Sequence, residues 1–221
     1  MKVDPKKLTY VTGLLGPGLI ILGSLVTALV YHGKQGEPYS FLNHFISELG
    51  EVGVSTLAPL FNVSLFASGL ILAIFMLGLG WYIHTWLAYL SAAVGIYSGI
   101  SCSLVGVFPM NHLSIHTTVA YSFFFSGLVA IALFTLAIVL DKQHKLSRWF
   151  VVPGLITVLS FASFLLVATQ GLSVRAQTLA VNNLARPTIW LTPLLEWSIF
   201  FTLLAWVILV SIYLATRSPR R

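Results

Sequence analysis

The sequence predicts an all-α fold, a bundle of six helices that cross a membrane. Three observations predict it. No Asp, Glu, Lys or Arg occurs in the 89 residues from Val52 to Leu140, and that length holds three crossings of roughly 20 apolar residues each. Charged residues make up only 8% of the chain, against roughly 25% in a soluble domain. The Lys and Arg residues lie at the ends of the apolar stretches rather than within them.

Six uncharged stretches mark the helices of a single membrane domain over residues 1–221, and each is long enough to cross a bilayer, some with tilt. Glu196 is the one charge that interrupts any of them. The predicted helices are residues 8–30, 56–82, 86–107, 113–140, 149–170 and 191–216.

Proline and small residues give these stretches individual features. In the first, Gly16-Pro17-Gly18 predicts a bend, because Pro17 has no backbone N–H to donate. The second, fifth and sixth carry a proline near their start, where proline is tolerated. The third has a small residue at every fourth position, which lets another helix approach closely. This stripe indicates a central helix of the bundle or, as the alternative, a homodimer face; it consists of Ser91, Gly95, Gly99 and Ser103.

The distribution of basic residues predicts the orientation. If the N-terminus is cytoplasmic, the cytoplasmic segments carry nine Lys and Arg residues and the outer segments carry three. Short cytoplasmic loops carry the excess of positive charge, so both termini are expected in the cytoplasm, at the cell membrane. The net charge of +6 is spread over helix ends rather than gathered on one face, which argues against nucleic acid as a partner.

This orientation places nearly all reactive side chains on the outer side. Two of them, His112 and His116, are spaced i, i+4 at the start of the fourth stretch, and a helix capped by Asn111 would put both imidazoles on one face. That pair suits a zinc ion if Glu48, His44 or Glu196 supplies a further ligand. The alternative is two interfacial histidines that hydrogen-bond to loop carbonyls or to lipid head groups.

Three further groups are candidates for chemistry. Glu48 precedes the second stretch, either as a general base or metal ligand paired with a histidine or an outer arginine, or as a solvated carboxylate. Ser47 adjoins it and could neighbour a histidine. Glu196 is an intramembrane carboxylate, a functional candidate by default, with Arg175 and Arg186 as expected partners. These arginines, with Glu196 and His44, also form the predicted site for a lipid head group or anion.

Two segments carry a resemblance to known families. The run Asn43-His44-Phe45-Ile46-Ser47-Glu48-Leu49-Gly50, with Gly106-Val107-Phe108-Pro109 and the two histidines that follow, resembles the microbial six-helix family known as domain of unknown function 998. More distantly, the segments are similar to the Frag1/DRAM/Sfk1 membrane proteins, some of which are linked to lipid remodelling and distribution. The resemblance implies a six-helix fold and a site at Ser47, Glu48 and His116, but no reaction.

The sequence therefore favours a lipid-interacting or regulatory membrane protein with a polar pocket at the outer leaflet, formed by Glu48, His112, His116 and Glu196. The first alternative is a metal-dependent intramembrane hydrolase that acts on a lipid, with water activated by a metal such as zinc. The second is a small transporter, which would want polar residues through the whole membrane depth and an inverted repeat.

Overall fold

The computed structural model describes residues 3–172 and 186–217, and this part of the chain consists of helices and connecting segments without strands. Six helices are long and apolar enough to span a membrane, two of them together with short flanking helices. The long helices are α1 (Pro5–Leu29), α2 (Ala58–Ile83), α3 (Trp86–Val107), α4 (Leu113–Leu140), α5 (Val151–Val167) and α7 (Leu191–Thr216). The short ones are η1 (Ile46–Gly50), η2 (Met110–His112), η3 (Arg148–Phe150) and η4 (Ala168–Leu172).

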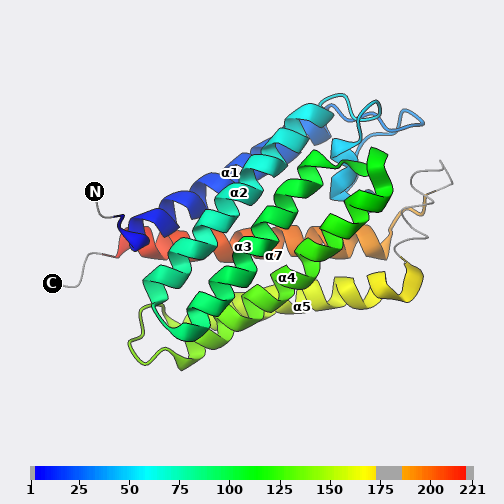
Figure 1. Cartoon of the computed structure of the whole chain (residues 1–221). Coiled ribbons are helices and arrows are strands. Elements are labelled where there is room, and N and C mark those ends of the chain that lie inside the picture. Colours follow the sequence, from blue (N-terminus) through cyan, green and yellow to red (C-terminus); the bar gives the residue numbers. More distant parts are fainter. Residues whose placement is uncertain (1–2, 173–185, 218–221) are drawn as a thin grey trace.

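The predicted helices are confirmed to within a few residues, and the largest difference at a helix start is in α1. This helix begins at Pro5 rather than at residue 8, because the Asp4 carboxylate accepts a hydrogen bond from the Lys6 N–H at 2.9 Å and caps the first turn. The ammonium group of Lys6 in turn donates to the carbonyl of Arg217. The two ends of the chain are therefore held at the same end of the bundle (Figure 1).

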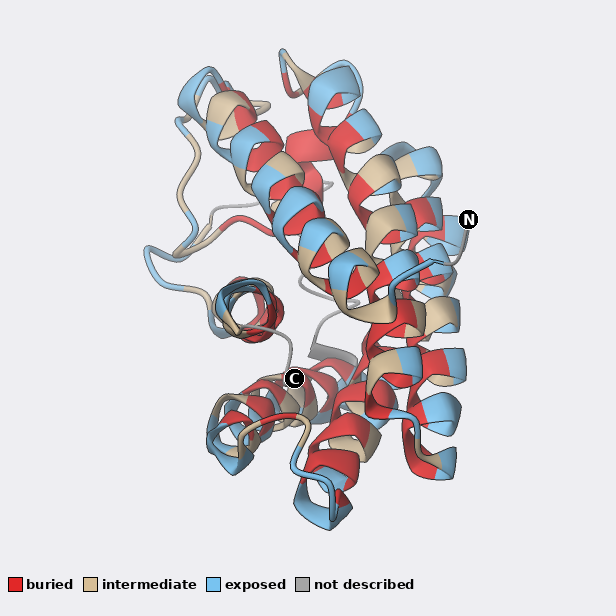
Figure 2. Cartoon of the chain, turned by 90° about the vertical axis from the view of Figure 1, so that its left-hand side faces the viewer, coloured by how far each residue is buried: buried red, intermediate tan, exposed pale blue. Residues whose placement is uncertain are grey.

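The six long helices close into a ring in which each packs against two neighbours, in the order α1, α2, α3, α4, α5, α7 and back to α1. Figure 2 shows this arrangement from the end where the termini lie, with buried residues turned toward the neighbouring helices. We call the opposite end, where α1 leads into η1 and α3 leads into η2, the distal end (Figure 1).

The small-residue stripe of α3 faces α2 inside this ring. A Cβ atom at Gly99 would lie 2.7 Å from the carbonyl oxygen of Gly69 and from the amide nitrogen of Ala73, both on α2. The Ser103 hydroxyl donates to the carbonyl of Phe66 on the same helix at 2.9 Å. The stripe is therefore buried in the contact between α2 and α3, and a homodimer through it would require α2 to move away.

The interior is filled unevenly along the bundle. Toward the termini, large side chains pack around Trp206, which is fully buried with Phe75 and Phe134 each 6.2 Å from it between ring centroids. Toward the distal end, an elongated cavity of about 120 Å³ lies between α1, α2, α3, α4 and α7. Gly16 and Pro17 line it, so the segment of α1 in which the sequence predicts a bend borders this space.

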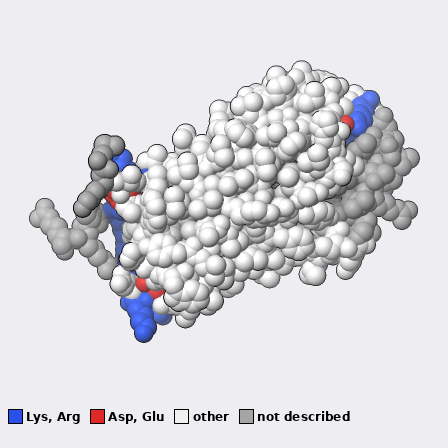
Figure 3. Space-filling model, viewed as in Figure 1, with Lys and Arg blue, Asp and Glu red and all other residues white. Residues whose placement is uncertain are grey.

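The outer surface between the two ends is apolar. Figure 3 shows Lys, Arg, Asp and Glu gathered at the two ends of the bundle, with a broad uncharged zone between them. Large apolar side chains in this zone point outward, among them Leu22 at 62% exposed and Leu159 at 64%. Such a surface is matched to lipid chains rather than to water. The protein is a multi-pass membrane protein.

Candidate functional site

The segment between α1 and α2, residues 30–57, folds against the distal end; we call it the cap (Figure 1). Its apolar side chains turn inward: Phe45 is 1% exposed and Leu49 is 0% exposed. Leu49 packs in a cluster with Ile20 of α1 and Phe61 of α2. Because burial of these groups stabilises the cap, the polar residues of η1 are carried inside the protein with them.

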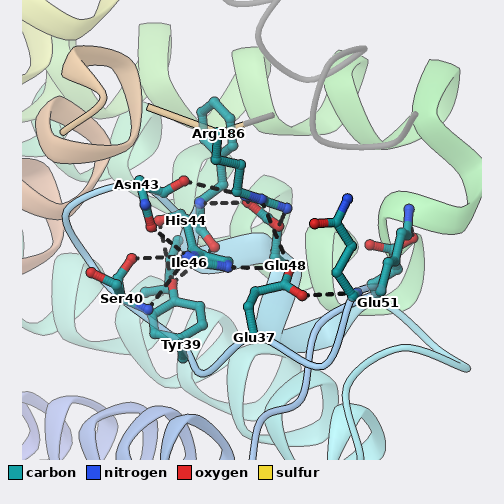
Figure 4. Close-up of polar contacts among 12 residues, drawn as sticks. Glu37, Tyr39, Ser40, Asn43, His44, Ile46, Glu48, Glu51 and Arg186 are labelled. Carbon is teal, nitrogen blue, oxygen red and sulfur yellow. Dashed lines mark hydrogen bonds and ion pairs between the residues drawn. The ribbon is translucent and has the colours of Figure 1, made fainter. Parts of the chain in front are cut away.

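The carboxylate of Glu48 lies at the centre of the buried polar groups of the cap (Figure 4). It is 1% exposed, which overturns the interpretation as a solvated loop carboxylate. Its Oε1 accepts from the Phe45 N–H at 2.8 Å and from Nη1 of Arg186 at 3.0 Å, and its Oε2 accepts from Nη2 of Arg186 at 2.6 Å. This two-bond geometry is the strongest form of carboxylate recognition by arginine.

Arg186 has three partners in the cap (Figure 4). Besides binding Glu48, it donates to the Asn43 carbonyl at 3.2 Å, and its Nε lies 3.9 Å from Oε1 of Glu37. Burial acts to lower the pKa of the Arg186 guanidinium, but the hydrogen bonds and the charge of Glu48 outweigh burial. The pKa is therefore raised above its usual value. Arg186 therefore stays charged and is committed to the cap.

Residues 186–190, which lead into α7, are joined to the cap through their backbone as well. The Trp190 N–H donates to the Leu42 carbonyl at 2.8 Å, and the Asn43 side-chain amide donates to the Pro187 carbonyl at 3.0 Å. Two parts of the chain that are far apart in sequence thus form one connected surface at the distal end.

His44, a predicted lipid or anion ligand, is packed inside the cap at 2% exposed. Its Nδ1 lies 2.7 Å from the Asn43 side-chain oxygen, and its Nε2 lies 3.8 Å from Glu37 without a hydrogen bond. Burial lowers the pKa of His44, against the opposing effect of the Glu48 charge. The rings of Tyr31 and Tyr39 pack on it, so it is not placed to meet a head group.

Glu196 has a different partner from the one that the sequence predicts. Its Oε2 accepts from the Ile46 N–H of η1 at 2.9 Å, whereas the expected partner Arg186 pairs with Glu48. Although Glu196 lies near the start of α7, it is only 8% exposed, because the cap covers this end of the helix. Arg175, the other expected partner, lies outside the described residues.

The two histidines near the start of α4 do not share a helix face, so this prediction is wrong. α4 begins at Leu113, and His112 precedes it in the turn η2 and is exposed. Asn111 does not cap the helix, since its side-chain amide exchanges two 2.9 Å hydrogen bonds with the backbone of Val52 in the cap. His116 alone turns inward, at 3% exposed, with Nδ1 2.8 Å from the Phe108 carbonyl.

These positions bear on the predicted zinc site. Across residues 3–172 and 186–217, no three side chains of His, Cys, Asp or Glu are grouped so that they could hold a metal ion. Glu48 is occupied by Arg186, and the exposed His112 is separated from the buried His116. The structure does not bring the three predicted ligands together.

Instead, the structure joins three of the candidates around the internal cavity. Ser47 of η1, His116 of α4 and Glu196 of α7 line its distal part, and aliphatic and aromatic side chains supply most of the remainder. Along α7 the lining runs from Glu196 to Val207, which is about 16 Å at 1.5 Å per residue. The cavity is therefore narrow and apolar with a polar end, which suits part of an aliphatic chain.

Sequence reasoning missed the aromatic groups that support this end. The Trp197 indole N–H lies 3.2 Å from both the Tyr39 hydroxyl oxygen and the His44 carbonyl, and the Tyr39 hydroxyl donates to the Phe45 carbonyl at 2.9 Å. These bonds join α7 to the cap. A tyrosine in a polar loop and a tryptophan next to Glu196 were visible signals, but interfacial aromatic residues are common in membrane proteins.

Comparison with known proteins identifies the family of this chain but assigns it no activity. The chain has no match among curated proteins and none among solved structures. The family model described as "Protein of unknown function (DUF998)" matches residues 14–213, which include all six long helices in whole or in large part, the cap and the cavity. The chain therefore belongs to the DUF998 family.

Proposed function

We propose that this protein binds a membrane lipid inside the bundle, with part of an aliphatic chain in the cavity and the polar part at Ser47, His116 and Glu196. The observation that carries the proposal is the cavity itself. Natural protein interiors are close-packed with few voids, and an apolar void of roughly 150 Å³ can admit a small apolar molecule. A space of about 120 Å³ in a protein surrounded by lipid has aliphatic chains as its most abundant neighbouring molecules.

This proposal revises the pocket expected from the sequence. There, Arg186 and Glu48 were to hold a head group together with Glu196 and the histidines. In the structure Arg186 and Glu48 satisfy one another, and their role is to hold the cap over the bundle. The ligand site is proposed to lie beneath the cap rather than on it.

The proposed place of action is the cell membrane, with both termini in the cytoplasm and the cap at the outer leaflet. The excess of Lys and Arg on the segments at the end of the bundle where the termini lie supports this orientation. The resemblance of the cap segment to Frag1/DRAM/Sfk1 proteins agrees with a lipid ligand and stays a prediction from sequence. In this setting the protein is a lipid-binding or regulatory component rather than a metal-dependent hydrolase.

Lipid retained by the purified protein tests the proposal. The full chain is isolated in a mild nonionic detergent, and bound lipid is extracted and quantified by mass spectrometry. Ala120→Leu and Val105→Phe fill the cavity from α4 and α3, and both are expected to reduce the retained lipid severalfold. Ala93→Leu, on an exposed face of α3, is the matched control and should retain the amount of the unsubstituted protein. Equal retention by all four proteins would refute an internal site.

A further inference from the structure

The polar end of the cavity has an unusual hydrogen-bonding balance. Its three polar side chains are each at least nine-tenths buried: Ser47 is 7% exposed, His116 is 3% and Glu196 is 8%. They come from η1, α4 and α7, so three separate elements each contribute a polar side chain to the lining of the cavity. The side-chain atoms that have no hydrogen-bond partner there determine which head group of a ligand fits.

Glu196 leaves an acceptor unpaired. Its Oε2 binds the Ile46 N–H, and its Oε1 has no hydrogen bond to any part of the chain that the structure describes. No Lys, Arg or His side chain of residues 3–172 and 186–217 forms an ion pair with it. An ionised carboxylate that is buried in a membrane-spanning helix without a cation is costly. A positive charge brought by a ligand would remove that cost.

His116 offers a second acceptor. Its Nδ1 binds the Phe108 carbonyl at 2.8 Å, and because a carbonyl oxygen can only accept, Nδ1 must carry the proton. The neutral imidazole is the main form of a histidine at pH 7. In that form, Nε2 has a free lone pair and no donor among the described residues, and His116 lines the cavity.

Arg186, a cation of the nearby cap, does not pair with these unpaired acceptors. Arg186 directs its guanidinium to Glu48, Asn43 and Glu37 in the cap, and it is not among the residues that line the cavity. Ser47 adds a hydroxyl, which can donate or accept. The polar end therefore has an unpaired oxygen on Glu196, an unpaired nitrogen on His116 and, among the described residues, no cation that could pair with a phosphate or carboxylate head group.

From this balance we infer that the ligand of the cavity is a long-chain amine whose protonated amino group pairs with the carboxylate of Glu196. The inference rests on the proposed function, since it assumes that an aliphatic chain enters the cavity. An ammonium group supplies three N–H donors and a positive charge, and Glu196 offers it an unpaired oxygen and, when ionised, a negative charge. Its hydrogen bonds to a carboxylate are charge-assisted and roughly twice as strong as neutral ones.

Binding of three probes with the same chain and different heads tests this inference. Radiolabelled octadecylamine is bound to the full chain in nonionic detergent, and unlabelled octadecylamine, octadecanol and octadecyl phosphate compete for the site. A charged hydrogen bond contributes about 1.5 kcal/mol or more, so the amine should bind at least about tenfold more tightly than the alcohol. The phosphate should compete less well than either.

Substitution of Glu196 separates the effect of the head-group charge from the effect of how the aliphatic chain fits. In Glu196→Gln, the amine should bind about as weakly as the alcohol, while alcohol binding stays unchanged and shows that the variant is folded. Glu51→Gln is the matched control: Glu51 is a buried acid of the cap, paired with Lys34 at 2.8 Å, and does not line the cavity. It should leave amine binding as it is.

The outcomes distinguish the two proposals. If octadecyl phosphate competes as well as the amine, or if the amine has no advantage over the alcohol in the unsubstituted protein, the head-group inference is wrong and lipid binding stands. If none of the three probes binds, or if Ala120→Leu binds them all as strongly as the unsubstituted protein does, the proposed function is wrong as well.

Discussion

Arg186 and Glu48 are 138 positions apart in the chain and form a two-bond ion pair at 2.6 and 3.0 Å. The pair joins the segment before α7 to the cap between α1 and α2. The carboxylate is 1% exposed, and the arginine side chain is 17% exposed. This difference in burial decides how each partner responds to substitution.

Removal of the arginine should destabilise the protein more than neutralisation of the acid. Arg186→Ala leaves a buried carboxylate without its cation, at a cost of about 3 kcal/mol of unfolding free energy. Glu48→Gln leaves an arginine that can turn toward solvent, and the loss should be smaller. Unfolding in detergent measures both. The exposed Arg148 provides the control Arg148→Ala, with a change within about 0.5 kcal/mol. A larger loss for Glu48→Gln than for Arg186→Ala would contradict the assignment.

Stability should depend on pH through His44. Burial lowers the pKa of this histidine below its usual 6.5, so near pH 6 the unfolded chain binds more protons than the folded one. The unfolding free energy should therefore fall as pH drops below about 7, by at most about 1.4 kcal/mol per pH unit. Above pH 7.5 this contribution is constant.

The variant His44→Gln should flatten this slope, measured as unfolding free energy between pH 5 and 8. Glu37 also has a lowered pKa: burial acts to raise it, but hydrogen bonds from its own backbone N–H and that of Gln35 outweigh burial. Its contribution to stability is lost only at more acidic pH, below the usual value of 4.5, so Glu37 does not account for a slope within the chosen window. An unchanged slope in the variant would assign the dependence to another group.

Substitution in the α3 stripe should separate close packing from helix propensity. Gly99→Ala places a methyl group 2.7 Å from backbone atoms of α2, which should cost about 1–3 kcal/mol. Gly18→Ala, on α1 with no atom within 4 Å of the added Cβ, should be neutral or stabilising by up to about 1 kcal/mol. Unfolding measurements in detergent compare the two, and size-exclusion chromatography reports the assembly state. Equal stability of both variants would contradict a close α2–α3 contact at Gly99.

The orientation can be tested by labelling single cysteines in intact cells. Cys102→Ser removes the one native thiol, and His112→Cys and Gln143→Cys then place exposed thiols at the distal end and at the termini end. A membrane-impermeant maleimide should label residue 112 in intact cells and residue 143 only after permeabilisation. The reverse pattern would place the cap in the cytoplasm.

The sequence predicted the helices well because the signal for a membrane-spanning helix is local. A stretch such as Trp86–Val107 must satisfy its own backbone hydrogen bonds in lipid, so its limits follow closely from its apolar length. It also predicted that Glu48, His116 and Glu196 lie at one end, since that follows from the number of crossings. The prediction failed where a site depends on the exact residue at which a helix begins. His112 lies in η2 rather than in α4, which separates it from His116.

By itself, the sequence determined that this chain is a six-helix membrane protein with its reactive side chains gathered at one end, because apolar length and the order of crossings are properties of the chain alone. Only the tertiary structure decided that Arg186 pairs with Glu48, and that Glu196 and His116 border an apolar cavity. Hydrogen bonds and ion pairs are made or lost over a few ångströms. Such distances depend on how the cap packs against α1, α2 and α7, and no spacing along the sequence records that packing.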